Sequence, residues 1–126
     1  MKMHHFLFIL LLSMTPFALT AQSMVGSWTY QATTPDGAEV TNTMIMNEDG
    51  TFTIDFASDG KAEVLGTYTI EGSKITIRDT PEESPCYGKD GVYNFQLEGD
   101  ALTITLIEDA CEIRRRDRPW TITRKK

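Results

Sequence analysis

The chain has 126 residues, is 40% hydrophobic and carries a formal net charge of −6. A net acidic protein is repelled by phosphate backbones and anionic lipid surfaces, so a nucleic-acid partner is not expected. The length supports one domain around one hydrophobic core.

Residues 1–21 have the pattern of a secretory signal peptide. Lys2 belongs to a basic front, residues 6–12 are an unbroken apolar run, and Ala21 places a small residue before the expected cut. The apolar run is shorter than the ~20 residues of a membrane span, so no stable membrane anchor is expected. We expect cleavage after Ala21, a periplasmic or secreted location, and a single domain over residues 22–126.

The mature chain would contain no histidine, because His4 and His5 both lie in the signal peptide. Its absence removes the usual general base at neutral pH, histidine-activated nucleophiles and histidine metal sites. We therefore expect no enzyme, no catalytic residues, no metal and no cofactor. The only two cysteines, Cys86 and Cys111, predict one structural disulfide in an exported protein of this size.

Apolar and polar residues alternate with a period of two through the mature chain, between turn signals about a dozen residues apart. Residues 68–77 and 95–104 repeat one hairpin pattern, in which a Glu-Gly turn joins two such strands. The pattern predicts eight or nine strands in an all-β, up-and-down antiparallel barrel, because closure removes exposed sheet edges. The expected inward rows are Trp28 and Tyr30; Phe52, Ile54 and Phe56; Val64, Tyr68 and Ile70; Ile75 and Ile77; Tyr93, Phe95 and Leu97; Leu102, Ile104 and Leu106; and Trp120 with Ile122.

One irregular stretch interrupts this pattern, residues 79–91, which contains two prolines and two glycines. We expect it to form a long loop at one rim, tied by Cys86 to a strand around Cys111. Such loops commonly carry contacts with ligands or partners.

The triplet Gly26-Ser27-Trp28 resembles the Gly-x-Trp that begins the first strand of lipocalins. In that family the tryptophan closes one barrel end, and an arginine of the last strand packs across it. Arg124 is the matching residue here, with a cation–π contact as the physical reason. The segment from Cys86 to Trp120 is also similar to bacterial secreted lipocalin-like domains.

The resemblance implies a calycin-type barrel whose ligand enters at the end opposite Trp28. Avidins and some bacterial metalloprotease-inhibitor barrels also begin with Gly-x-Trp. The mature chain leaves no room for the C-terminal helix of vertebrate lipocalins, and their loop motif between the middle strands is not evident.

The leading functional hypothesis is an exported protein that binds a small hydrophobic molecule inside the barrel. Phe52, Phe56, Tyr68 and Tyr93 are the expected contact residues, with Gly66 leaving space for the ligand and the tyrosine hydroxyls orienting it. The alternative is a packed core with a protein partner, as in the inhibitor barrels, engaged through residues 22–25, the long loop or the rim.

Three further groups have more ordinary interpretations. Met44 and Met46 could hold Cu(I) through their thioethers but are expected in the core. The arginine-rich run 114–118 is expected to be a solvated strand end, with an anion-binding rim as the alternative. The acidic neighbours expected to neutralise this run are Glu108, Asp109 and Glu112. Glu82 and Glu83 are expected to face solvent rather than to form a catalytic acid–base pair.

Overall fold

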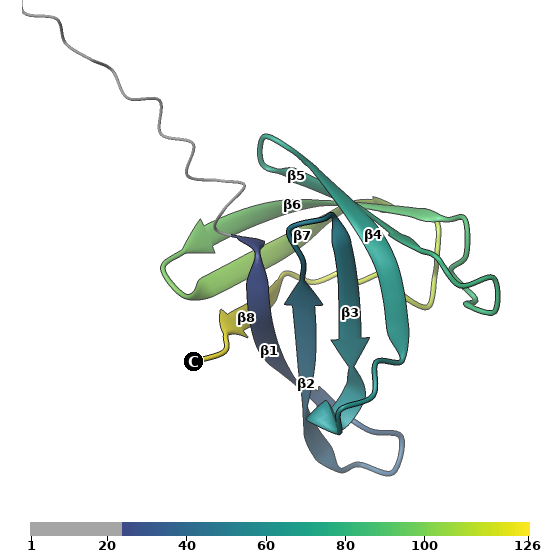
Figure 1. Cartoon of the computed structure of the whole chain (residues 1–126), viewed down its shortest axis with the longest axis vertical. Coiled ribbons are helices and arrows are strands. Elements are labelled where there is room, and N and C mark those ends of the chain that lie inside the picture. Colours follow the sequence, from purple (N-terminus) through teal and green to yellow (C-terminus); the bar gives the residue numbers. More distant parts are fainter. Residues whose placement is uncertain (1–23) are drawn as a thin grey trace, which may run out of the picture.

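Eight antiparallel strands close into a barrel in a computed structural model that describes residues 24–126 (Figure 1). The predicted signal peptide and its cleavage site lie outside the described residues. The strands are β1 (Gly26–Thr33), β2 (Glu39–Met46), β3 (Thr51–Asp55), β4 (Val64–Glu71), β5 (Lys74–Asp79), β6 (Asp90–Glu98), β7 (Ala101–Asp109) and β8 (Trp120–Arg124). One 3-10 turn, η1 (Phe56–Ser58), follows β3. The predicted all-β barrel with about eight strands is confirmed.

The strands follow one another around the barrel in chain order, and β8 closes it against β1 through the pair Trp28 and Arg124. The repeated hairpin pattern predicts two of these connections correctly. Glu71 pairs with Lys74, Glu98 pairs with Ala101, and the turn glycines between them have φ angles of 60° and 59°. In Figure 1 strands β2 and β3 run vertically, while β6 and β7 run nearly horizontally, at a steep angle to them, as strong twist requires.

One barrel end, the closed end, is formed where β1 begins and β8 ends. Trp28 is fully buried there, and the guanidinium carbon of Arg124 lies 4.3 Å from the centre of its ring. The indole Nε1 donates a hydrogen bond to the Met24 carbonyl at 3.0 Å, and Arg124 Nη1 donates to the Val25 carbonyl at 3.1 Å. A Cβ on Gly26 would lie 2.9 Å from Arg124 Nη1. The contact predicted between Trp28 and Arg124 is therefore present.

The barrel interior carries a continuous apolar cluster from all eight strands. Met44 and Met46 belong to it, in agreement with their interpretation as core residues. Gly66 also faces inward, but a Cβ there would lie 2.5 Å from Phe52 Cε1 and 2.4 Å from the Arg78 carbonyl oxygen. The ring of Phe52 already fills the space that the missing side chain provides, so Gly66 leaves none there for a ligand.

The end of the barrel opposite Trp28, the open end, is bounded by four connections of unequal length. The longest two are residues 80–89, between β5 and β6, and residues 110–119, between β7 and β8. The Cys86–Cys111 disulfide joins them, with 5.4 Å between the two Cα atoms, which confirms the predicted pairing. Cys111 follows the end of β7 rather than lying on the strand.

No helix within residues 24–126 has the length and apolar character needed to cross a bilayer.

Candidate ligand cavity

A cavity of about 680 Å³ occupies the barrel interior and opens between the connections of the open end. Its volume falls within the range of ligand pockets, roughly 300–1,000 Å³. The lining residues come from every strand. The deep walls are apolar; they include Met24, Tyr30, Met44, Met46, Phe52, Ile54, Ile75, Ile77, Tyr93, Leu102 and Ile104. The rim combines apolar and charged side chains, namely Phe56, Glu63, Val64, Leu65, Asp79, Pro81, Glu83, Ser84, Pro85, Cys86, Ile113, Arg114, Arg116 and Trp120.

Three of the five residues expected to contact a ligand line this cavity: Phe52, Phe56 and Tyr93. Phe56 is 44% exposed at the rim, on η1 rather than on a strand. Tyr68 and Gly66 do not line it. The Tyr68 hydroxyl donates a 2.5 Å hydrogen bond to the Asn47 carbonyl, in the turn at the closed end, because its side chain points toward that end.

The Tyr93 hydroxyl is already occupied by a neighbour. It donates a 2.5 Å hydrogen bond to Asp109 Oδ2, while the ring borders the cavity. Burial raises the pKa of Tyr93 strongly, and the hydrogen bond to Asp109 and the charge of Asp109 add to the effect. Tyr93 therefore supplies an apolar surface to the cavity, and its hydroxyl supports the rim.

A buried ionic network holds the rim together on the side of the disulfide. Arg114 bridges Asp79 and Asp109, with Nη1 at 3.1 Å from Asp79 Oδ1 and Nη2 at 2.8 Å from Asp109 Oδ1. Nη2 also donates to the Lys89 carbonyl at 2.8 Å, and Nε donates to Asp109 Oδ2 at 2.9 Å. The exposed fractions of the side chains are 14% for Arg114, 8% for Asp79 and 0% for Asp109. The expectation that the whole arginine-rich run is solvated is wrong for Arg114, because two carboxylates from different strands compensate its charge.

Two local features bring Asp109 into the barrel. Between β6 and β7 the register shifts so that Val92 faces Glu108 but Tyr93 faces Leu106, which leaves Ile107 as an extra residue. The extra residue reverses the alternation, so Asp109 turns inward and Glu108 outward. Gly91 provides the room, since a Cβ there would lie 2.7 Å from Asp109 Oδ2.

The network makes the free energy of unfolding depend on pH in the acidic range. Burial alone would raise the pKa of Asp109, but hydrogen bonds from Arg114, Tyr93 and the Cys111 amide outweigh burial and lower it below the ordinary 3.8. A lowered pKa in the folded state gives stability that is present above about pH 4 and is lost as the pH falls through the folded value. We expect the free energy of unfolding, measured by urea titration at a series of pH values, to decrease below about pH 4.

Asp109→Asn is the control for this acid dependence. Asp36, Asp49 and Asp55 also have lowered pKa values, from hydrogen bonds in their turns, so the wild-type curve alone does not isolate Asp109. The variant should lose part of the acid dependence that the wild type shows. Parallel curves for the two proteins between about pH 5 and pH 2 would contradict the assignment.

An aromatic pair with a stacked arginine forms another part of the rim. The rings of Tyr30 and Trp120 meet edge to face, with 4.6 Å between their centres. The guanidinium carbon of Arg116 lies 4.4 Å from the Trp120 ring centre and 5.9 Å from that of Tyr30. Burial raises the pKa of Tyr30, against a hydrogen bond with Asn42 and the charge of Arg116, which lower it. This group faces the same cavity.

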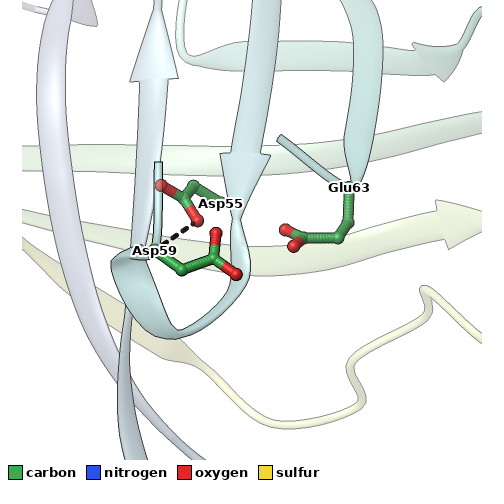
Figure 2. A group of neighbouring side chains, drawn as sticks. All are labelled: Asp55, Asp59 and Glu63. Carbon is green, nitrogen blue, oxygen red and sulfur yellow. Dashed lines mark hydrogen bonds between the residues drawn. The ribbon is translucent and has the colours of Figure 1, made fainter. Parts of the chain in front are cut away.

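Three carboxylates gather where β3 ends and the β3–β4 connection begins and returns: Asp55, the last residue of β3, and Asp59 and Glu63 of the connection (Figure 2). Their ligand-type oxygen atoms lie within 4.8 Å of one another. Hydrogen bonds within the connection account for their positions. Asp55 accepts from the amides of Asp59 and Gly60 at 3.0 and 2.9 Å, and Glu63 Oε2 accepts from the Phe56 amide at 2.7 Å. We assign these carboxylates to shaping the turn.

The sequence predicts only part of the arrangement of side chains at the rim. Asp79 has a recognisable signal, since it continues the inward alternation of Ile75 and Ile77. Trp120 was expected to face inward but not to form a rim with Arg116. No sequence pattern distinguishes Arg114, whose side chain is mostly buried, from Arg115, which pairs with Asp117 in solvent.

Comparison of the chain with protein-family models, with curated proteins and with solved structures found no match.

Proposed function

We propose that this protein is an exported, lipocalin-like carrier that binds a small hydrophobic molecule inside its barrel. The observation that carries the proposal is the cavity of about 680 Å³, whose deep walls are apolar. Transfer of apolar surface from water gains about 25 cal/mol per Å², so a ligand that buries ~200 Å² gains roughly 5 kcal/mol before the costs of association.

Other features support the proposed family and location. An eight-stranded meander with Trp28 packed under Arg124 at one end matches the resemblance carried by Gly26-Ser27-Trp28. A disulfide is typical of proteins in oxidising compartments, which supports export together with the predicted signal peptide.

The inhibitor alternative has less support. It requires an N-terminal arm that is free to enter a protease cleft. Met24 is instead 1% exposed, borders the cavity and is held through its carbonyl by the Trp28 indole. An enzymatic role also lacks support among the described residues, because the buried carboxylates of the rim are committed to Arg114.

A cavity-filling variant tests the proposed function. Ile104 faces the cavity, so Ile104→Trp should occupy ligand space and weaken binding of the fluorescent apolar probe N-phenyl-naphthylamine by about tenfold or more. The measurement is a fluorescence titration of the mature chain, with near-ultraviolet circular dichroism to verify folding.

Thr105→Trp is the matched control, since Thr105 is the next residue on β7 and is exposed. The wild type and this control should bind the probe saturably with equal affinity. Absence of saturable binding to the wild type, or equal affinity for Ile104→Trp, would overturn the proposed function.

A further inference from the structure

Arg116 has an unusual setting at the mouth of the cavity. Its guanidinium is stacked on Trp120 and lies close to Tyr30, and all three side chains line the cavity. Stacking on an aromatic face restrains a guanidinium while leaving the N–H groups around its edge free to donate. The aromatic pair therefore places a cation at the edge of an apolar cavity.

The other charged groups that line the cavity are engaged elsewhere or lie in solvent. Arg114 uses Nε, Nη1 and Nη2 on Asp79, Asp109 and the Lys89 carbonyl. Glu63 accepts from the backbone of its own connection, and Glu83 is exposed on the long loop.

The guanidinium of Arg116 differs from those of Arg114 and Arg115 in its ion pairing. Within residues 24–126 no carboxylate lies within salt-bridge distance of Arg116, whereas the adjacent Arg115 lies 3.6 Å from Asp117. Among the cations lining the cavity, it is Arg116 whose donors are not taken by a carboxylate of this chain.

The same stacking disfavours a cationic ligand. Aromatic faces at a cavity mouth attract cations through their quadrupoles, but here Arg116 already covers Trp120. A second cation would meet both an occupied face and a like charge. An anionic group at the rim would instead meet free N–H donors, and it would stay partly hydrated because Arg116 is exposed.

We infer that the ligand of this cavity is an amphipathic anion, with its apolar chain between the strands and its carboxylate or similar head group on Arg116. This inference rests on the proposed function and narrows it from hydrophobic molecules in general to those with a negative head. Arg116 is a specificity-determining residue in this arrangement, and the apolar walls supply the binding that all ligands of the cavity share.

Three probes with the same chain and different heads separate these contributions: dodecanoate, dodecanol and dodecyltrimethylammonium. Dodecanoate and dodecyltrimethylammonium are titrated below their micelle concentrations, and dodecanol below its solubility limit, each as a competitor of N-phenyl-naphthylamine. The mature chain is used at an ionic strength of about 0.15 M, where the Debye length of about 8 Å screens its net charge. Dodecanoate should compete best and dodecyltrimethylammonium worst.

Arg116→Gln should weaken dodecanoate by about tenfold, the scale of a charge-assisted hydrogen bond, and leave dodecanol unchanged. Arg115→Gln is the matched control, with the same change of charge one residue away, and should bind dodecanoate like the wild type. Arg116→Lys should show an intermediate loss, because lysine keeps the charge but lacks the planar stacking and paired donors of arginine.

The outcomes distinguish this inference from the function on which it rests. If dodecanol competes as well as dodecanoate, or if Arg115→Gln loses dodecanoate as strongly as Arg116→Gln, the role of Arg116 is overturned while the hydrophobic carrier stands. Preferential binding of dodecyltrimethylammonium would also overturn the anionic ligand. If none of the probes, N-phenyl-naphthylamine included, binds saturably, the proposed function fails and this inference fails with it.

Discussion

Replacing Arg114 by methionine should reduce the free energy of unfolding at neutral pH by about 3–5 kcal/mol. The change would leave two carboxylates without their cation, and the Asp109 side chain is fully buried. Removing one partner of a buried ion pair is more costly than losing a surface pair, because the remaining charge stays away from water. Urea unfolding monitored by tryptophan fluorescence measures the effect.

Arg115→Met is the matched control for this variant. Arg115 carries the same charge at the adjacent position, but its ion pair with Asp117 is exposed, with side chains 44% and 79% accessible. Exposed pairs contribute about 0–1 kcal/mol, so this variant should unfold close to the wild type. Equal destabilisation by the two substitutions would contradict the structural role of Arg114.

The acid dependence gives a second readout for Arg114→Met. Without the guanidinium, burial should favour the protonated form of Asp109 in the folded state. A folded-state pKa above the unfolded value gives stability that is present at low pH and lost as the pH rises. The difference between variant and wild type should therefore shrink as the pH falls, beginning at the raised pKa of the variant, above about pH 4, and continuing to the lowered pKa of the wild type. A lost packing contact alone would give a difference that does not change with pH.

The double substitution Cys86→Ser and Cys111→Ser should lower the free energy of unfolding by about 3.5 kcal/mol. The disulfide spans 25 residues and joins the two long connections of the open end, so its loss increases the conformational entropy of the unfolded chain. For a domain of this size the thermal midpoint should fall by roughly 15 °C, measured by circular dichroism.

Reduction of the wild type provides the control for this prediction. Reduced wild type and the double variant should share one midpoint, and reductant should not change the variant further. An unchanged midpoint in the variant, or free thiols titrated in the folded and oxidised protein, would contradict the structural disulfide.

The strands and their order were predictable because they depend on local signals. Alternation with a period of two places Tyr93, Phe95 and Leu97 on one face, and the Glu-Gly turns leave little choice but an antiparallel neighbour. The disulfide followed from a count, since the only two cysteines of a chain that is expected to be exported have one simple pairing.

The candidate site was less predictable, because its positions depend on long-range pairing. The extra residue at Ile107 reverses the alternation and places Asp109 rather than Glu108 on the inside, and no local sequence pattern indicates it. Gly66 illustrates the same limit. Its inward direction was predicted correctly, but the ring that fills its space comes from Phe52 on the neighbouring strand. Tyr68 and Tyr93 were equivalent in sequence, yet they point toward opposite ends of the barrel.

By itself the sequence determined the all-β class, the closed up-and-down order and the disulfide, since alternation, turns and a cysteine pair are local or pairwise properties. The contact of Arg124 with Trp28 was expected only from the resemblance carried by Gly26-Ser27-Trp28. Only the tertiary structure decided that the barrel is hollow, that Arg114 lies mostly buried between two carboxylates, and that Arg116 is exposed at the mouth of the cavity. These outcomes depend on how completely side chains from strands that are far apart in the sequence fill the shared interior of the barrel. Strand alternation specifies the direction of each side chain. The summed volume of the inward-facing side chains around the closed barrel specifies how much cavity remains.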